Sequence, residues 1–216
     1  MTGDYNPNKY IAYIFDLDGT ILDSKGDISY YLEKTFLDFG LFFDEKRLVI
    51  GPPLSEVIKI FVPNIDSELC TKVIKRYREY YNGCDFRRTK LYPQVKTALE
   101  AIYNKKHSLF IATNKPSIPV KILLEKFGLT SFFSCIVTPD IFPDRTIDKT
   151  EMIQYLINEF QLNLSKTLMI GDSASDIQAG KICGIDSAAY LMGYTDNATL
   201  IKAEATFAFD DYSFFL

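Results

Sequence analysis

The chain's first apolar run ends in Phe15-Asp16-Leu17-Asp18-Gly19-Thr20, and a later one ends in Gly171-Asp172-Ser173-Ala174-Ser175-Asp176. Side chains alternate along a strand, so two carboxylates two residues apart, such as Asp16 and Asp18, point the same way at a strand end. A second acidic pair arriving from another strand completes a cage of oxygen ligands for a hard divalent cation. The two stretches therefore predict an acidic cation site at a sheet edge and chemistry on a phosphate.

Length and composition limit the class of protein. The 216 residues, 47% of them apolar, predict one sizeable core with room for an inserted second unit. The net charge of −4, without a Lys/Arg run, argues against a nucleic-acid partner. No apolar stretch reaches the roughly 18 residues that span a membrane. The polar N-terminus and four cysteines without C-x-x-C spacing predict a reduced cytoplasmic protein without a signal peptide.

Short apolar runs alternate with helical segments, which predicts a doubly wound parallel α/β sheet covered by helices on both faces. The expected strands are Tyr10–Phe15, Ser108–Ala112, Cys135–Val137, Thr167–Ile170 and Ser187–Leu191. The expected helices are Pro93–Lys105, Pro119–Phe127, Lys149–Phe160 and Ala174–Cys183. Pro93 and Pro119 suit first-turn positions, and Gly128 and Gly184 stand where helix C-caps belong.

One segment, from about Ser24 to Arg88, lacks this alternation. Its apolar residues recur at helical spacing in two stretches, one ending at Gly40 and one running from Asp66 to Asn82-Gly83. We therefore expect a helical subdomain at 23–88, inserted into an α/β core made of 1–22 and 89–216. Tyrosines and cations within 75–81 favour a packed helix with one solvated face over a substrate pocket.

Polar residues follow the strands, and ligands of doubly wound sheets bind at the carboxyl ends of strands. The candidates are Asp16, Asp18, Thr113, Asn114, Asp172 and Asp176, with Lys149 opening a helix. They offer acids for a metal, a hydroxyl and an amide for phosphate oxygens, and one cation. A carboxylate that attacks phosphorus needs a cation to offset charge repulsion, and a second carboxylate can move the proton. Asp18 is placed for that second task.

Four motifs together resemble those of the haloacid dehalogenase-like hydrolase superfamily, in the right order and over the whole chain. They are Asp16-x-Asp18-Gly19-Thr20, Thr113-Asn114, Lys149 and Gly171-Asp172-x-x-x-Asp176. The helical insert is similar to that family's small α-helical cap. Within it, Gly51-Pro52-Pro53-Leu54 resembles a loop of phosphoglycolate-phosphatase-type members.

The resemblance implies Mg²⁺-dependent hydrolysis of a small phosphorylated metabolite, phosphoglycolate-like or nucleotide-like, through an aspartyl-phosphate. It implies that Asp16 is the nucleophile and Asp18 the acid and base. Thr113 and Asn114 would bind phosphate, and Lys149 would be the counter-charge. The implied Mg²⁺ ligands are Asp16, the backbone carbonyl of Asp18 and Asp172, and Asp176 is implied to act on the metal indirectly, behind these ligands or through water. Lys115 competes with Lys149 as the counter-charge, because Thr150 follows Lys149 where such members often have Pro.

Simpler structural interpretations exist for each motif. Asp16 and Asp18 could form an Asp-rich turn, although not an EF-hand loop, because Ile21 stands where that loop needs Gly. Asp172 and Asp176 could cap a helix N-terminus, as could Thr113-Asn114. The functional alternatives are a phosphomutase of the same superfamily and a non-catalytic phosphate-binding regulatory module. A dehalogenase is disfavoured because it would have no use for the acid at Asp18.

Overall fold

The computed structural model describes residues 5–216. By its internal contacts the chain divides into two units, Met1–Asp23 with Leu91–Leu216, and Ser24–Lys90. The expectation of no signal peptide rests partly on residues 1–4, which lie outside the described residues. Within residues 5–216, no helix is long and apolar enough to cross a bilayer.

The first unit is built on a six-stranded sheet with the order β5-β4-β1-β6-β7-β8. All of its neighbouring strands are parallel. Its strands are β1 (Ala12–Phe15), β4 (Ser108–Ala112), β5 (Cys135–Val137), β6 (Thr167–Gly171), β7 (Asp186–Tyr190) and β8 (Phe207–Phe209). The chain winds outward from β1 to β5 and then from β6 to β8, so the winding direction reverses between β1 and β6. The expected doubly wound fold is therefore confirmed, and its switch point lies beside Asp16.

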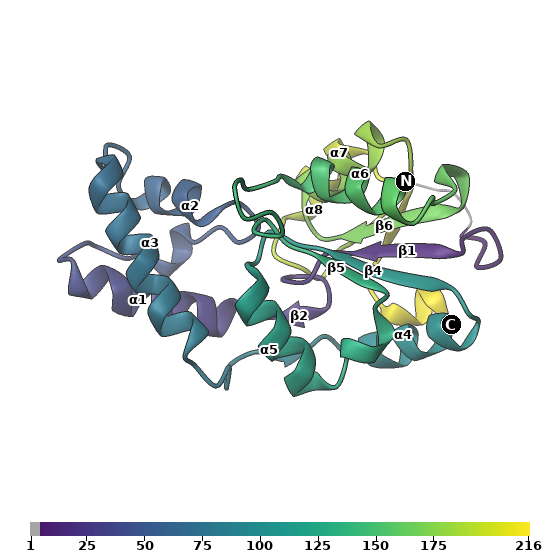
Figure 1. Ribbon diagram of the computed structural model, residues 1–216, viewed down its shortest axis with the longest axis horizontal. Helices are drawn as coiled ribbons and strands as arrows, with labels where there is room; N and C mark the ends of the chain where they lie inside the picture. The colour runs from purple at the N-terminus through teal and green to yellow at the C-terminus, as the bar shows by residue number, and fades with distance from the viewer. Residues whose placement is uncertain (1–4) are drawn as a thin grey trace. The chain divides into compact units, whose positions relative to one another are not determined.

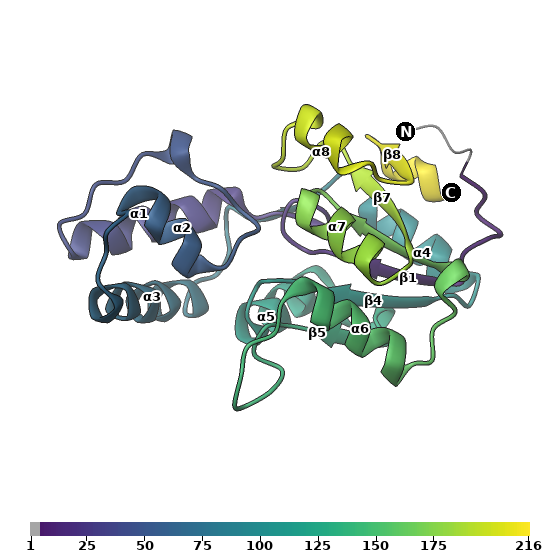
Figure 2. The ribbon, with the colours of Figure 1, turned by 90° about the horizontal axis from the view of Figure 1, so that it is seen from above.

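Helices cover both faces of this sheet (Figures 1 and 2). One face carries α4 (Val95–Asn104) and α5 (Ser117–Phe127), and the other carries α6 (Lys149–Glu159), α7 (Ala174–Ile182) and α8 (Asn197–Ala203). On β1, Ala12 and Ile14 pack into the core cluster that contains Met152 of α6. The rings of Tyr13 and Phe15 lie 6.2 and 6.3 Å from that of Phe215 on the opposite side. Burial on both faces explains the continuous apolar runs in the sequence.

Some element ends differ from the expectation. Helix α4 begins at Val95 rather than Pro93, because Gln94 caps it with a left-handed φ of 60°. Helix α5 begins at Ser117, so Pro119 lies within its first turn instead of opening it. Gly128 is the C-cap of α5 with a φ of 65°, as expected.

Several elements were not expected from the sequence. They are α8, β8, the short strands β2 (Leu22–Asp23) and β3 (Lys90–Leu91), which form a second sheet, and the 3₁₀ turns η1 (Glu45–Arg47), η2 (Thr130–Phe132), η3 (Leu164–Lys166) and η4 (Tyr212–Phe215). Each is short, with too few residues to show a periodic pattern.

The second unit is helical: α1 (Lys25–Asp38), α2 (Leu54–Phe61) and α3 (Ser67–Asn82). Helix α3 has the expected ends, because the Asp66 side chain accepts hydrogen bonds from the backbone N–H groups of Glu68 and Leu69. Helix α2 was not expected; it begins at Leu54, the last residue of the stretch interpreted as a loop. The buried Asp27 carboxylate accepts hydrogen bonds from the Arg88 backbone and the Thr89 hydroxyl, which ties the two ends of this unit together.

Candidate active site

The carboxyl ends of the central strands bring the expected residues of the first unit together. Asp16 follows β1, and its backbone N–H donates to the Ile170 carbonyl of β6 at 2.8 Å, which fixes its place beside that strand. Lys149 is the first residue of α6, which begins at a capping box formed by Asp148 and Glu151. These two local features fix the backbone on each side of the Asp16–Lys149 contact.

The Lys149 ammonium contacts three oxygens. Its Nζ lies 2.7 Å from Asp16 Oδ1, 2.9 Å from Asp176 Oδ1 and 2.8 Å from the Ala112 carbonyl oxygen. The contacts with Asp16 and with the Ala112 carbonyl are hydrogen bonds, and the contact with Asp176 is an ion pair. The Lys149 side chain is only 7% exposed. Lys149 is thus fixed between the first acidic motif and the second.

Asp176 both caps a helix and belongs to the acidic cluster, the two interpretations that the sequence left open. Its Oδ2 accepts hydrogen bonds from the Ser173 backbone and hydroxyl at 3.1 and 2.6 Å, completing the capping box of α7. Its Oδ1 faces Lys149. Helix capping therefore orients the same carboxylate that takes part in the acidic cluster.

Asp172 is held by contacts that the motif alone does not reveal. The Thr20 hydroxyl donates to its Oδ1 at 3.0 Å, and the Tyr194 backbone N–H donates to its Oδ2 at 2.8 Å. Glycines make room for it: a Cβ at Gly19 would lie 2.2 Å from its Oδ2, and one at Gly193 would lie 2.2 Å from its Cβ. Gly19 also has a φ of 88°, which other residues rarely adopt.

Asp18 belongs to a separate ion pair. Lys115 Nζ lies 2.9 Å from its Oδ1 and 2.7 Å from its Oδ2. The Lys115 side chain is 3% exposed and that of Asp18 is 13% exposed. Of the two lysines that the sequence offered as counter-charges, Lys149 contacts the expected nucleophile Asp16, and Lys115 contacts the expected acid and base.

Thr113 and Asn114 directly follow β4. Thr113 is buried, its backbone N–H donates to the Val137 carbonyl at 3.1 Å, and its hydroxyl accepts from the Lys115 backbone at 3.2 Å. Asn114 is partly exposed. Both lie on the short link between β4 and α5 that also carries Lys115, so the link places the expected phosphate binders next to the Asp18 pair.

The three buried acids shift one another's ionisation. Burial, with the nearby charge of Asp176, raises the pKa of Asp16 to about 7, although Lys149 acts in the opposite direction. Burial and the charges of Asp16 and Asp176 raise the pKa of Asp172 to about 8. Burial lowers the pKa of Lys149, but Asp16 and Asp176 outweigh it and raise that pKa above its usual range. One ammonium is therefore too little positive charge for three buried carboxylates.

This donor set fits a divalent metal ion. Oxygens of Asp16, Asp172 and Asp176 all lie within 4.8 Å of one another. Among residues 5–216 this is the one group of three or more side chains with metal-ligand geometry, and it contains no His or Cys. Hard carboxylate oxygens suit Mg²⁺, Ca²⁺ or Mn²⁺ rather than softer ions.

The family-model comparison supports the same assignment. The haloacid dehalogenase-like hydrolase family model matches residues 13–190, a span that contains every expected catalytic, phosphate-binding and metal-binding residue from Asp16 to Asp176. The chain belongs to the haloacid dehalogenase-like hydrolase family.

Relatives of this family resemble the chain over nearly its full length. It is 31% identical over 208 residues to the phosphoglycolate phosphatase of Vibrio cholerae serotype O1, covering 91% of each chain. It is 31% identical over 186 residues to that of Aquifex aeolicus, covering 84% of each. A crystal structure described as a predicted phosphatase from Clostridium acetobutylicum has a TM-score of 0.85 and 26% identity, with 94% of this chain and 95% of that one covered. The fold is thus shared with this solved structure over 94% of the chain.

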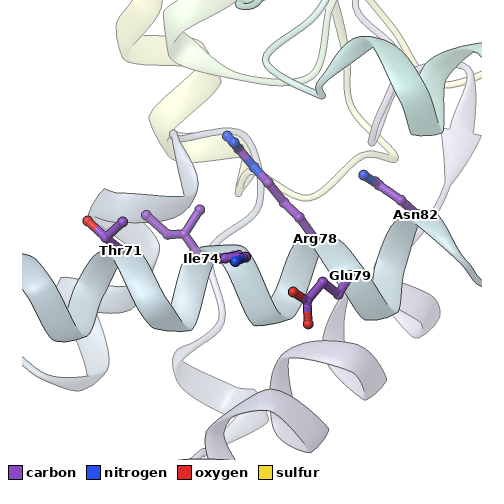
Figure 3. Close-up of a pocket in the computed structure, with 6 residues that line it drawn as sticks. Thr71, Ile74, Arg78, Glu79 and Asn82 are labelled. Carbon is purple, nitrogen blue, oxygen red and sulfur yellow. The ribbon is translucent and has the colours of Figure 1, made fainter.

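One contact of this family member had no signal in the sequence, and one pocket lies in the stretch where a substrate pocket was weighed against a packed helix. Tyr194 supports Asp172 through its backbone, so no side-chain pattern could have indicated it. An open pocket of ≈ 340 Å³ lies along α3 of the helical unit (Figure 3). It is lined by Thr71, Ile74, Lys75, Arg78, Glu79 and Asn82, and contains none of the expected catalytic residues. Tyr77 and Tyr81 are buried instead, as the packed-helix interpretation of this stretch expects.

Proposed function

We propose that this haloacid dehalogenase-like phosphatase hydrolyses a small phosphate monoester with Mg²⁺, through a phosphoryl group carried on Asp16. The observation that supports it most is the place of Asp16. Its carboxylate lies at the switch point of the sheet, in contact with Lys149 and within the acidic cluster. Phosphoryl transfer depends on positioning and on charge stabilisation, which this arrangement supplies.

In the first half of the reaction, an Asp16 oxygen forms a bond to phosphorus and the bond to the leaving oxygen breaks. Asp18 gives that oxygen a proton. In the second half, a water oxygen attacks the same phosphorus, its proton passes to Asp18, and the bond to Asp16 breaks. Lys149 keeps the Asp16 carboxylate in place, and Thr113 and Asn114 bind the phosphate oxygens. Mg²⁺, held by Asp16, Asp172 and Asp176 with the Asp18 carbonyl, would offset the charge on the phosphoryl oxygens.

The substrate that we propose is a small phosphorylated metabolite that carries a second anionic group. Relatives such as the Vibrio cholerae protein are phosphoglycolate phosphatases, which supports a phosphoglycolate-like ester. The helical unit Ser24–Lys90 would act as the cap that selects among esters. Within this unit, the α3 pocket contains the exposed cations Lys75 and Arg78, which suit an anionic group of a ligand.

Phosphate release from an ester panel, with EDTA and with added Mg²⁺, tests this proposal. We expect no turnover in EDTA, recovery with Mg²⁺, and loss of turnover in Asp16→Asn, whose amide keeps the shape but cannot attack phosphorus. Asp196→Asn is the matched control, because it changes an exposed N-cap aspartate to another good cap residue. Turnover in excess EDTA, or steady-state activity in a clean Asp16→Asn preparation, would refute the proposal.

A further inference from the structure

The Asp18–Lys115 pair differs from ordinary surface ion pairs in burial and geometry. Lys115 Nζ lies within 2.9 Å of both carboxylate oxygens, and its side chain is 3% exposed. By contrast, Lys181 and Glu204 form a pair with side chains that are 44% and 80% exposed. A long side chain held in a buried site on both oxygens of one carboxylate restricts that carboxylate to a single orientation.

The local fold supports this restriction. Lys115 follows the buried Thr113 by two residues, and its backbone N–H donates to the Thr113 hydroxyl. Pro116 then caps α5, which begins at Ser117. On the other side, Asp18 lies in a tight turn in which the Gly19 N–H donates to the Leu22 carbonyl at 2.8 Å. Both partners therefore have a fixed backbone, so the ion pair orients the Asp18 side chain.

We propose that Lys115 is a positioning residue that holds the Asp18 carboxylate for the second half of the reaction, and that it is not a phosphate counter-charge. This inference rests on the proposed function. The group that accepts the proton of the attacking water has to face that water, and the two contacts of the Lys115 ammonium hold both Asp18 oxygens in one orientation. In that step the water oxygen bonds to phosphorus, the Asp16 oxygen leaves, and the water proton goes to Asp18.

The inference predicts a specific kinetic defect in Lys115→Met, which keeps most of the length of the side chain and removes its charge. Breakdown of the phosphoryl-Asp16 state should become rate-limiting. We expect kcat to fall about 10–10²-fold, part of the roughly 10²–10⁴-fold that general acid–base catalysis contributes. The lowered kcat should be equal for esters with good and poor leaving groups. A rapid burst of about one leaving group per site should precede the slow steady state.

A double-mutant cycle separates positioning from phosphate binding. In the Asp18→Asn background, Lys115→Met should lower kcat by less than about twofold further, because the group it positions has been removed. Lys115→Arg keeps the charge and should show a smaller fall in kcat, which provides a second variant if the Met variant fails to fold. Lys121→Met, on the exposed surface of α5, the helix that follows Lys115, is the control and should match wild type.

Each outcome decides between the possibilities. The positioning role would be overturned if Lys115→Met lowered kcat by the same factor in the wild-type and the Asp18→Asn backgrounds. It would also be overturned if Lys115→Met raised KM and the inhibition constant for inorganic phosphate while kcat stayed unchanged. Either result would identify Lys115 as a phosphate ligand. Unchanged kcat and no burst in both Lys115 variants would also overturn it. Wild-type protein that hydrolyses no ester with Mg²⁺ would overturn the proposed function itself, which is a different result.

Discussion

Lys149→Met offers a direct test of how the acidic cluster is balanced. The substitution keeps most of the side-chain volume but removes the ammonium that contacts Asp16, Asp176 and the Ala112 carbonyl. The carboxylates then face one another without their buried cation. We expect the variant to fold with lower stability and to lose phosphatase activity.

The size of the loss follows from burial. Breaking a buried ion pair by removing one partner costs roughly 3–5 kcal/mol, because the remaining charge is left uncompensated. The Lys149 side chain is 7% exposed and that of Asp176 is 0% exposed, so solvent screens this pair little. For a protein of this length, about 1 kcal/mol corresponds to about 2–4 °C in Tm. We therefore expect Tm in EDTA to fall by about 6–20 °C.

Thermal melts in EDTA and across a Mg²⁺ titration provide the assay. Because the variant cluster has one positive charge fewer, Mg²⁺ should raise its Tm more than that of wild type. Lys181→Met is the matched control, since its exposed pair with Glu204 should contribute about 1 kcal/mol or less. A Lys149→Met variant that melts within 2 °C or so of wild type in EDTA, or that gains no more from Mg²⁺, would refute the charge-balance reasoning.

Three further predictions concern pH, the glycine Gly193 that makes room for Asp172, and the cap. The pKa of Asp16 is raised to about 7 and that of Asp172 to about 8, so the folded state keeps protons that the unfolded chain loses near pH 4. Stability in EDTA should therefore fall as pH rises from about 4 to 8, and Mg²⁺ at pH 8 should recover it; melts that show the opposite slope would contradict this. Gly193→Ala places a Cβ 2.2 Å from that of Asp172, so it should displace this carboxylate and raise the Mg²⁺ concentration needed for half-maximal kcat/KM. An unchanged Mg²⁺ titration would contradict the role of Gly193 in making room for Asp172. Arg78→Met should raise KM for phosphoglycolate more than for an aryl phosphate without a carboxylate, whereas Lys72→Met, already paired with Glu68, should change neither.

Much of the first unit could be predicted because its strands are buried on both faces. Ser108–Ala112 and Cys135–Val137 match the observed β4 and β5 residue for residue, since their apolar runs are uninterrupted and bounded by polar residues. The start of α4 could not be predicted in the same way. Pro93 is a good first-turn residue, but Gln94 takes a left-handed conformation that sequence alone does not indicate. α8 has only seven residues, too few to give a periodic signal. β8 is as short as β5, and its apolar run Phe207-Ala208-Phe209 was not recognised as a strand.

In the candidate site, too, some residues could be placed from the sequence and others could not. Asp16, Asp172 and Asp176 could be expected to meet, because strand ends of a parallel sheet share one edge. The partner of each lysine could not be predicted, because the sequence places both Lys115 and Lys149 shortly after strands that end at this edge. Which carboxylate each lysine contacts depends on the direction in which its side chain leaves the backbone. That direction is set by the folded link after β4 and by the first turn of α6. The catalytic roles of all these residues stay predictions.

The distribution of charge at the strand ends favours a divalent cation over a monovalent one. Four carboxylates, those of Asp16, Asp18, Asp172 and Asp176, face two ammonium groups in this unit. The Lys115 ammonium is paired with Asp18, so the whole excess of two negative charges falls on the cluster around Lys149. A single divalent ion would neutralise that excess, whereas a monovalent ion would leave a buried carboxylate uncompensated. A third lysine would neutralise part of the excess too, but it would remove the reason for a metal to bind. The separation of the two lysines therefore leaves the cluster around Lys149 acidic enough for a divalent cation, while Lys115 orients Asp18 through a separate ion pair.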